Sequence, residues 1–216
     1  MTIRDKLRAL PALAGPFPSF DTTAAPDDPA ILFVEWLGEA ISAGIREPHA
    51  VVLSTVDEAG HPDERFLLLK EVDVRGWQVA CVRTSPKGCQ IAAQPHVALT
   101  SYWQTMGRQV RVRGIAAEME DTARREDFLA RSEGARAVAL TGRQSGVLSD
   151  PDTMDAEVAE QRQRLASAPD TVAPDWALYA VRPLAVEFWQ GDTGRRHTRL
   201  VYRREPEGWR RHLLYP

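Results

Sequence analysis

The chain has 216 residues and a net charge of −3, from 27 Lys and Arg against 30 Asp and Glu. This length suits one sizeable core in one domain, or at most two, and the 44% hydrophobic content is that of an ordinary folded protein. The acidic balance argues against general nucleic-acid binding, which needs a basic surface, and no apolar run reaches the roughly 20 residues of a membrane span.

Residues 1–27 are rich in Pro, Ala and Asp, and we expect them to form an irregular arm. Asp28 and Pro29 then predict a helix start, because Asp is a good N-cap acceptor and Pro suits the first helical position. The apolar residues that follow recur at helical spacing, and Gly44 is expected to end this helix. The N-terminus has no apolar core long enough for a signal peptide, so we expect a cytoplasmic protein.

Short β-rich runs joined by tight turns dominate the rest of the chain. A helix is expected between two of them, with Ser85 as N-cap and Lys87 in its first turn, and two more are predicted at about 120–132 and 152–167. Strands are predicted at 49–56, 65–72, 76–83, 96–103, 108–114, 176–189, 199–204 and 209–214. This order predicts one α+β domain, mainly β, with a barrel core and flanking helices.

The two cysteines, Cys81 and Cys89, form no C-x-x-C pair and no Cys/His cluster, so no metal site is expected. We expect both to be reduced thiols packed as small apolar residues. No nucleophile–base pair is evident, since Ser145 lacks the G-x-S-x-G surroundings of a hydrolase nucleophile. The glycine-rich motifs of dinucleotide and P-loop sites are absent as well.

Basic residues gather at four places that are candidates for binding an anion. They are Arg65 and Lys70 on one strand, Lys87 at a helix start, Arg108, Arg111 and Arg113 on another strand, and Arg195, Arg196, His197 and Arg199 in a turn. The helix start is favourable because free N–H groups and the helix dipole attract anions. A solvent-exposed strand or loop is the alternative, and for Arg111 and Arg113 it is the better one. Anion sites without a catalytic pair favour a cofactor that does the chemistry.

Six motifs, in order, resemble the pyridoxamine 5′-phosphate oxidase family. They are RFLLLK at 65–70, RQV at 108–110, RQS at 143–145, EFWQG at 187–191, R-x-H-x-R at 195–199 and WRRHLLYP at 209–216. The match runs from about residue 28 to the C-terminus. It implies one FMN-binding split β-barrel domain over 28–216, which includes a C-terminal dimerisation and active-site segment. It also implies a homodimer with one FMN in each of two clefts between the subunits.

The resemblance further implies which residues act. FMN contacts are expected from Arg65, Phe66, Leu67, Leu68, Leu69, Lys70, Ala80, Cys81, Lys87, Gln109, Gln144, Ser145, Trp189 and Arg199. The substrate is expected to meet Lys70, Arg131, Arg195 and His197, with Arg195 and His197 as the catalytic residues. The family's reaction passes a hydride from a small heterocyclic substrate to flavin N5, and O2 then reoxidises the flavin to give H2O2.

Three positions depart from the family pattern. Where the family grips the substrate phosphate with Lys, Tyr, Arg and Ser, this chain keeps Lys70 and Arg131 but has Asp127 and Ala135 in the other two places. Lost donors weaken the grip on a buried phosphate, and a nearby carboxylate repels it. Pro86 replaces an arginine for the FMN phosphate, which removes both a side chain and a backbone donor. We therefore expect FMN to bind, but less tightly.

The N-terminal third is similar to the phenazine-biosynthesis branch of the family, through PFPSFD at 16–21 and GIREP at 44–48. Two substrates follow: pyridoxamine or pyridoxine 5′-phosphate, or a reduced aromatic precursor in secondary metabolism, which the altered phosphate site favours slightly. A non-catalytic flavin-binding protein on the same fold is the alternative function. A structural protein without a cofactor is a third interpretation.

Overall fold

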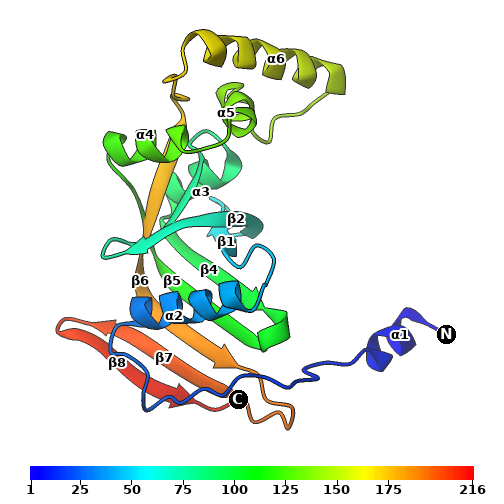
Figure 1. Cartoon of the computed structure of the whole chain (residues 1–216), viewed down its shortest axis with the longest axis vertical. Helices are drawn as coiled ribbons and strands as arrows, with labels where there is room; N and C mark the ends of the chain where they lie inside the picture. Colours follow the sequence, from blue (N-terminus) through cyan, green and yellow to red (C-terminus); the bar gives the residue numbers. More distant parts are fainter. The chain divides into compact units, whose positions relative to one another are not determined.

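The computed structural model describes all of residues 1–216, and its internal contacts divide the chain into two compact units (Figure 1). Unit 1 comprises 1–48, 100–112 and 184–216, and unit 2 comprises 49–99 and 113–183. The helices are α1 Ile3–Ala9, α2 Pro29–Ser42, α3 Pro86–Ala93, η1 Gln104–Met106, α4 Asp121–Leu129, α5 Glu133–Leu140 and α6 Pro151–Ser167. The strands are β1 Ala50–Val56, β2 Pro62–Asp73, β3 Gly76–Val82, β4 His96–Trp103, β5 Arg108–Glu118, β6 Trp176–Gln190, β7 Thr198–Glu205 and β8 Gly208–Leu214.

The eight strands form one sheet in the order β3-β2-β1-β4-β5-β6-β7-β8. A further antiparallel pairing of β3 with β6, in which Trp77 lies opposite Val181, closes six of them into an antiparallel barrel. Gly76 makes this closure possible, because a Cβ on it would lie 2.2 Å from the carbonyl oxygen of Val181, and its φ of +120° is one that glycine adopts readily. The predicted barrel with flanking helices is confirmed.

In unit 1, α2 begins as the sequence predicts. The Asp28 side chain accepts a hydrogen bond from the backbone N–H of Ala30 at 2.8 Å, and Pro29 occupies the first helical position. The helix buries Phe33 and Trp36, and the Trp36 ring meets Phe188 edge-on at 5.2 Å between centroids. This aromatic packing holds α2 against β6.

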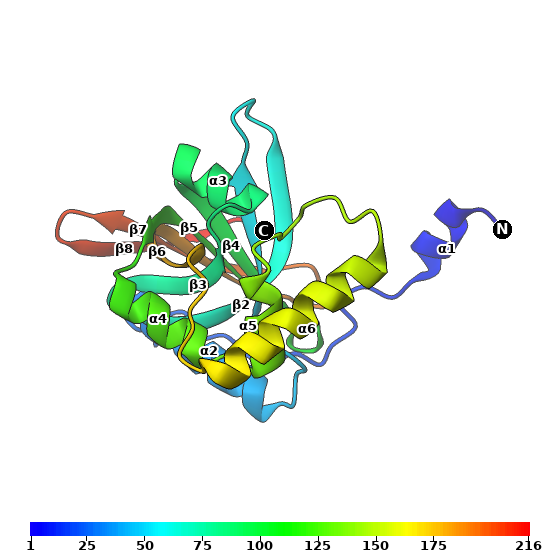
Figure 2. The ribbon, with the colours of Figure 1, turned by 90° about the horizontal axis from the view of Figure 1, so that it is seen from above.

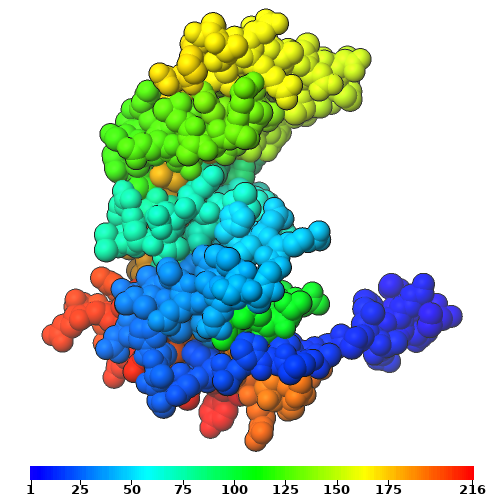
Figure 3. All heavy atoms as spheres, viewed as in Figure 1, coloured from blue at the N-terminus to red at the C-terminus, as the bar shows by residue number.

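The prediction of an irregular arm is wrong at its start, because residues 3–9 form α1. Thr2 and Asp5 make a reciprocal capping box there, which sequence inspection missed. None of the α1 residues is buried, and Figure 3 shows its atoms exposed to solvent. Local capping therefore accounts for this helix. The division of the chain into an arm over 1–27 and a single domain over 28–216 stays a prediction.

In unit 2, an apolar core lies beneath α4 and α5. Phe128 is fully buried and meets Trp176 edge-on at 5.7 Å between ring centroids, with Val82 and Leu178 in the same cluster. Helices α5 and α6 lie side by side, as Figures 1 and 2 both show. No helix of the chain has the length and apolar character needed to span a bilayer.

Two predictions in unit 2 need correction. The expected helix at 120–132 ends at Leu129, and α5 follows it, because Ser132 caps a new helix by accepting a bond from the backbone N–H of Ala135 at 3.4 Å. The two cysteines also differ from one another. Cys81 is buried, as expected, but Cys89 is exposed and is not packed as an apolar residue.

Candidate functional site

The start of α3 holds a buried cation. Ser85 is the N-cap, but its hydroxyl turns back and donates to the carbonyl of Val82 at 2.6 Å and does not cap the helix. The Lys87 ammonium donates to the Ser85 hydroxyl at 3.3 Å and to the Gln144 side-chain oxygen at 3.1 Å, and it has no carboxylate partner. The residue is only 7% exposed, and burial lowers the pKa of Lys87 below its ordinary value.

Gly88 lets the helix start approach the preceding strand. A Cβ on Gly88 would lie 2.2 Å from the carbonyl oxygen of Arg83, so a larger residue would push α3 away from β3. Pro86 fits the first helical position, where the helix needs no N–H donor. The helix dipole and Lys87 together make this turn a favourable place for an anion.

Arg65 lies on β2 with two neutral oxygen atoms and one carboxylate as partners. Its guanidinium donates to the hydroxyl of Thr55 at 2.5 Å and to the side-chain oxygen of Gln90, in α3, at 3.2 Å. It also pairs with Asp63, whose side chain is half exposed. The Gln90 bond connects Arg65 to the helix that carries Lys87. The positive charge of Arg65 also acts to lower the pKa of Lys87, so the two cations are electrostatically coupled.

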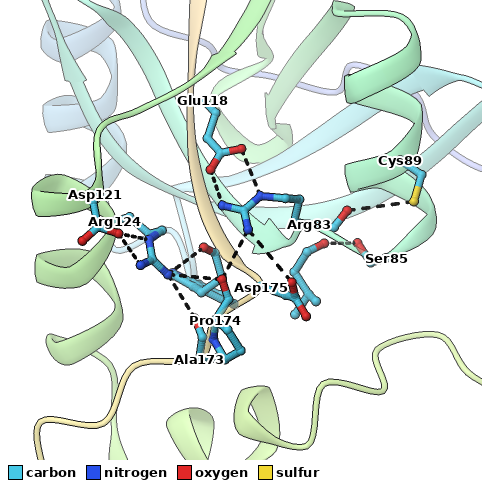
Figure 4. Close-up of polar contacts among 11 residues, drawn as sticks. Arg83, Ser85, Cys89, Glu118, Asp121, Arg124, Ala173, Pro174 and Asp175 are labelled. Atoms are coloured by element: carbon cyan, nitrogen blue, oxygen red, sulfur yellow. Dashed lines mark hydrogen bonds and ion pairs between the residues drawn. The ribbon is translucent and has the colours of Figure 1, made fainter.

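Two arginines shown in Figure 4 connect the regions around the starts of α3 and α4 to the backbone before β6. Arg83, the residue after β3, pairs with Glu118 and donates to the carbonyl of Pro174 at 3.3 Å. Arg124, on α4, pairs with Asp121 and donates to the carbonyl of Ala173 at 3.1 Å. Both hold the segment that leads into β6, so the loop before α3 and the first turns of α4 are tied to the same stretch of backbone.

A second polar group joins α4, β2 and β6 in unit 2. Asp127 accepts a hydrogen bond from the indole N–H of Trp176 at 2.8 Å, and its other oxygen lies 3.5 Å from the Lys70 ammonium. The Arg131 guanidinium stacks on the face of the same indole, 4.2 Å from the ring centroid. Two residues expected to meet the substrate, Lys70 and Arg131, thus share Asp127 and Trp176 as neighbours.

In unit 1, a buried glutamate connects two strands that carry predicted site residues. Glu187, 8% exposed on β6, accepts from Arg199 at 2.8 Å and also pairs with Arg111. Burial by itself raises the pKa of Glu187, but the hydrogen bonds and charges of the two arginines outweigh it, so the pKa lies below its ordinary value. Arg111 remains half exposed, as expected of a solvent-facing strand residue, although it has this partner.

The turn between β6 and β7 orients His197. The backbone N–H of Asp192 donates to His197 Nδ1 at 3.1 Å, so the neutral ring carries its proton on Nε2. The imidazole packs on the Trp189 ring with 4.8 Å between centroids. Arg195 has a φ of +65°, a strained conformation for a residue with a side chain, and its backbone N–H bonds to Asp192 at 3.0 Å.

The remaining residues predicted to contact FMN differ in their burial. Leu69, Ala80 and Cys81 are buried, Leu67 and Gln109 are partly buried, and Phe66, Leu68 and Ser145 are exposed. By unit, Gln109, Trp189, Arg195, His197 and Arg199 lie in unit 1, and the other predicted residues lie in unit 2. Burial raises the pKa of the Cys81 thiol to about 11, so it is a neutral packing group at physiological pH.

Sequence inspection missed the partners of the predicted residues. Gln90 and Trp176 contact Arg65 and Arg131, and Asp192 fixes the ring of His197. Gln90 and Asp192 had an available signal, because each lies a few residues from a predicted site residue. Trp176 had none, since it is 45 or more residues from the side chains that it contacts.

Comparisons with known proteins find matches over most of the chain. The family profile described as "Pyridoxamine 5'-phosphate oxidase" matches residues 37–165, and that of the "Pyridoxine 5'-phosphate oxidase C-terminal dimerisation region" matches 176–216. The chain is 38% identical over 190 residues to pyridoxine/pyridoxamine 5′-phosphate oxidase 1 of Ralstonia nicotianae, covering 88% of this chain and 89% of that protein. The corresponding protein of Rubrobacter xylanophilus is 39% identical over 192 residues, covering 89% and 88%.

Solved structures show the same fold. PhzG from Burkholderia lata, crystallised with tetrahydrophenazine-1-carboxylic acid, superposes with a TM-score of 0.86 at 27% identity, covering 94% of this chain and all of that one. A pyridoxamine 5′-phosphate oxidase-related, FMN-binding protein from Nostoc punctiforme gives a TM-score of 0.67 at 18% identity, covering 91% and 100%. The second likeness concerns the fold alone.

Proposed function

Because the chain belongs to the pyridoxamine 5′-phosphate oxidase family, we propose that it is an FMN-dependent oxidase that works as a homodimer on a small heterocyclic substrate. The observation that carries the proposal is the buried ammonium of Lys87. It lies at a helix start and has only neutral oxygen atoms as partners. A cation buried in this way is stabilised by an anionic ligand, and the FMN phosphate is an anion of suitable chemistry.

Residues of unit 2 would hold the flavin phosphate. Lys87 and Arg65 supply charge, and Gln144 already contacts Lys87 through its side-chain oxygen. Lys87 and Gln90, the α3 partner of Arg65, lie within one turn of each other. This donor set fits a phosphate even though Pro86 supplies neither a side-chain donor nor an N–H. When bound, FMN would supply the redox chemistry, in which a hydride leaves the substrate and O2 is reduced to H2O2.

Arg195 and His197 would engage the substrate. Since His197 Nδ1 accepts from the backbone, Nε2–H is the donor that remains for a ligand. Trp189 restricts the tilt of the imidazole ring, so the donor points in a defined direction. Arg195 would place its positive charge against an electron-rich group of the substrate, and the contribution of both residues is to orient the reacting carbon and to stabilise charge.

Two exposed apolar residues on β2 agree with a homodimer. Phe66 is 76% exposed and Leu68 43% exposed, and both belong to the motif expected to contact FMN. Because they are two positions apart on the strand, they lie on one face and form an apolar surface that a partner or a ligand can cover. A second copy of the chain that meets this strand would cover them.

The physiological substrate is either pyridoxamine or pyridoxine 5′-phosphate or a reduced aromatic precursor of the phenazine type. The names of the 38–39% identical relatives favour the first, and the ligand of PhzG favours the second. We favour the second because Asp127 lies next to Lys70, where a phosphate would meet a negative charge.

The first experiment is the absorption spectrum of the purified protein with and without added FMN. A flavin spectrum that survives gel filtration, together with H2O2 release when a substrate is supplied, is expected of an oxidase. Rapid oxidation of pyridoxamine 5′-phosphate would defeat the phenazine-type assignment. Colourless protein that does not take up FMN would defeat the function as a whole.

The alternative is a flavin-binding protein without catalysis. Arg195→Ala separates the two, because Arg195 is exposed at a turn and its loss is expected to leave the core intact. An oxidase is expected to keep FMN and lose turnover in this variant. Wild-type protein whose flavin no donor reduces would favour the binding protein.

A further inference from the structure

Asp127 is held in a fixed place by two neighbours. Its side chain is 10% exposed, one oxygen accepts from Trp176 at 2.8 Å, and the other lies 3.5 Å from the Lys70 ammonium. The next residue, Phe128, is fully buried against Trp176 and anchors this part of α4 in the core of unit 2. The carboxylate therefore cannot swing away from Lys70 without breaking the indole bond.

Arg131 is the second cation of this group, and the protein leaves part of it unsatisfied. Its guanidinium stacks on Trp176, its terminal nitrogen makes a long bond of 3.4 Å to the carbonyl of Ala135, and its Nε is buried without an acceptor. The guanidinium makes no direct ion pair, although the negative charge of Asp127 acts on it from farther away. The two cations thus differ, because Lys70 lies within ion-pair distance of Asp127, whereas Asp127 acts on Arg131 only through its charge at longer range.

From these contacts we propose that Asp127 makes the Lys70–Arg131 group a subsite for a monoanionic carboxylate and excludes a phosphate dianion. Two cations and one internal carboxylate leave a net charge of about +1, which one carboxylate neutralises. A phosphate ester carries a charge close to −2 above its second pKa of about 6. It would therefore leave the group negatively charged and would lie beside Asp127.

This inference rests on the proposed function, since it places the substrate's anionic group at Lys70 and Arg131. It goes further by naming the substrate class, an aromatic carboxylic acid, and the residue that selects it. Ala135 agrees with this class because its side chain offers no hydroxyl for a phosphate oxygen. A planar carboxylate has two acceptor oxygens and needs fewer donors than a phosphate does.

The test is Asp127→Asn, which keeps the shape and leaves an oxygen to accept from Trp176. Calorimetric titration of FMN-treated protein at pH 8 compares pyridoxal 5′-phosphate, a dianion, with phenazine-1-carboxylate, a monoanion. Wild type is expected to prefer the carboxylate. Since Coulomb energy scales with ligand charge, the variant should bind the phosphate roughly tenfold tighter and the carboxylate only about threefold tighter.

Glu126→Gln is the matched control, because Glu126 lies on the same helix, is exposed and carries the same charge. It is expected to leave both dissociation constants within about twofold of wild type. Asp127→Ser serves as a second variant if the first loses its thermal transition. A ratio of the two dissociation constants that neither Asp127 variant changes, or wild type that prefers the phosphate, would overturn the proposal.

Binding is measured here without turnover, so the two proposals fail in different ways. Protein that takes up no FMN but shows the shifted ratio would contradict the oxidase and leave the carboxylate subsite standing. An active flavin oxidase with an unshifted ratio would contradict the subsite alone.

Discussion

Lys87→Met is the sharpest perturbation of the proposed flavin site. Methionine keeps most of the length and apolar volume of the side chain and removes the ammonium. The structure gives this change two opposite consequences. FMN binding should weaken because a charged donor is lost, and the protein without FMN should not be weakened, because a buried cation without a carboxylate partner is lost as well.

The size of each effect follows from the contacts. A hydrogen bond to a charged group is worth about 1.5–3 kcal/mol, so the dissociation constant for FMN should rise about 10-fold to 100-fold. In the apoprotein, the ammonium gives up two bonds to neutral oxygens, at 3.3 and 3.1 Å, and no ion pair. Relief of its desolvation should offset them, and we expect the free energy of unfolding to stay constant or rise by about 1 kcal/mol.

The lowered pKa of Lys87 also predicts how the stability difference between wild type and Lys87→Met changes with pH. Burial lowers the pKa of Lys87 in the folded state from an ordinary value of 10.5, so the unfolded chain holds this proton more tightly. The free energy of unfolding of the wild-type apoprotein should therefore rise relative to that of Lys87→Met as the pH rises from the lowered pKa toward 10.5. Below that window the cost of burying the charge is fully present, and the variant should have its largest advantage.

The assays are fluorescence titration of FMN and urea denaturation of the apoprotein between pH 7 and 10.5. Lys6→Met is the control, because Lys6 is an exposed lysine on α1. It should change neither quantity. A Lys87→Met protein that binds FMN with wild-type affinity would refute the assignment of the phosphate to this helix. A variant that loses apoprotein stability would refute the claim that Lys87 is an unpaired, costly charge.

Three further outcomes are expected. Gly88→Ala should lower the free energy of unfolding by about 1–3 kcal/mol, because its Cβ would meet the Arg83 carbonyl at 2.2 Å. Gly38→Ala, which has open space around it in α2, should raise the free energy of unfolding by about 0.5–1 kcal/mol. Equal denaturation midpoints for the two variants would contradict this. Glu187→Gln should weaken the fall in the free energy of unfolding at acid pH. The lowered pKa of Glu187 stabilises the wild type above pH 4.5, and this stabilisation is lost as the pH falls through the folded pKa. Denaturation curves with the same pH dependence in both proteins would exclude that role. A thiol reagent should modify one cysteine in the native protein and two in guanidinium, because Cys81 is buried and Cys89 is exposed. Rapid modification of both cysteines in the native state would contradict this and show that β3 opens readily.

The helices and strands were largely predictable from the sequence because their signals are local. The N-caps Asp28 and Ser85 mark helix starts, and β4 begins and ends at the predicted residues, His96 and Trp103. Errors occurred where a local signal was weak. Ser132 starts a new helix inside a stretch that looks continuously helical, and Thr2 caps a short helix in a segment whose composition suggests a loop.

The partners of the site residues were less predictable, because the fold determines them over long sequence separations. Thr55 and Gln90 are 35 residues apart and meet at 2.5 Å, and both contact Arg65. Asp127 and Trp176 are 49 residues apart. No periodicity or spacing encodes such a meeting. The sequence therefore indicates which residue types are present, and the fold determines which charges are compensated.

Two of the departures from the family pattern, Pro86 and Asp127, have different physical consequences for this reason. Pro86 lies at a helix position that requires no N–H, so it removes one ligand donor and leaves Lys87 in its place. The proposed flavin site then keeps its positive charge, and its affinity for the phosphate is only partly reduced. Asp127 lies between a cation and a buried indole, and it changes the net charge around the proposed substrate subsite. A lost donor lowers affinity for the same ligand, whereas a fixed charge of opposite sign changes which ligand binds best. The substrate, and not the cofactor, is therefore where this chain should differ most from its relatives.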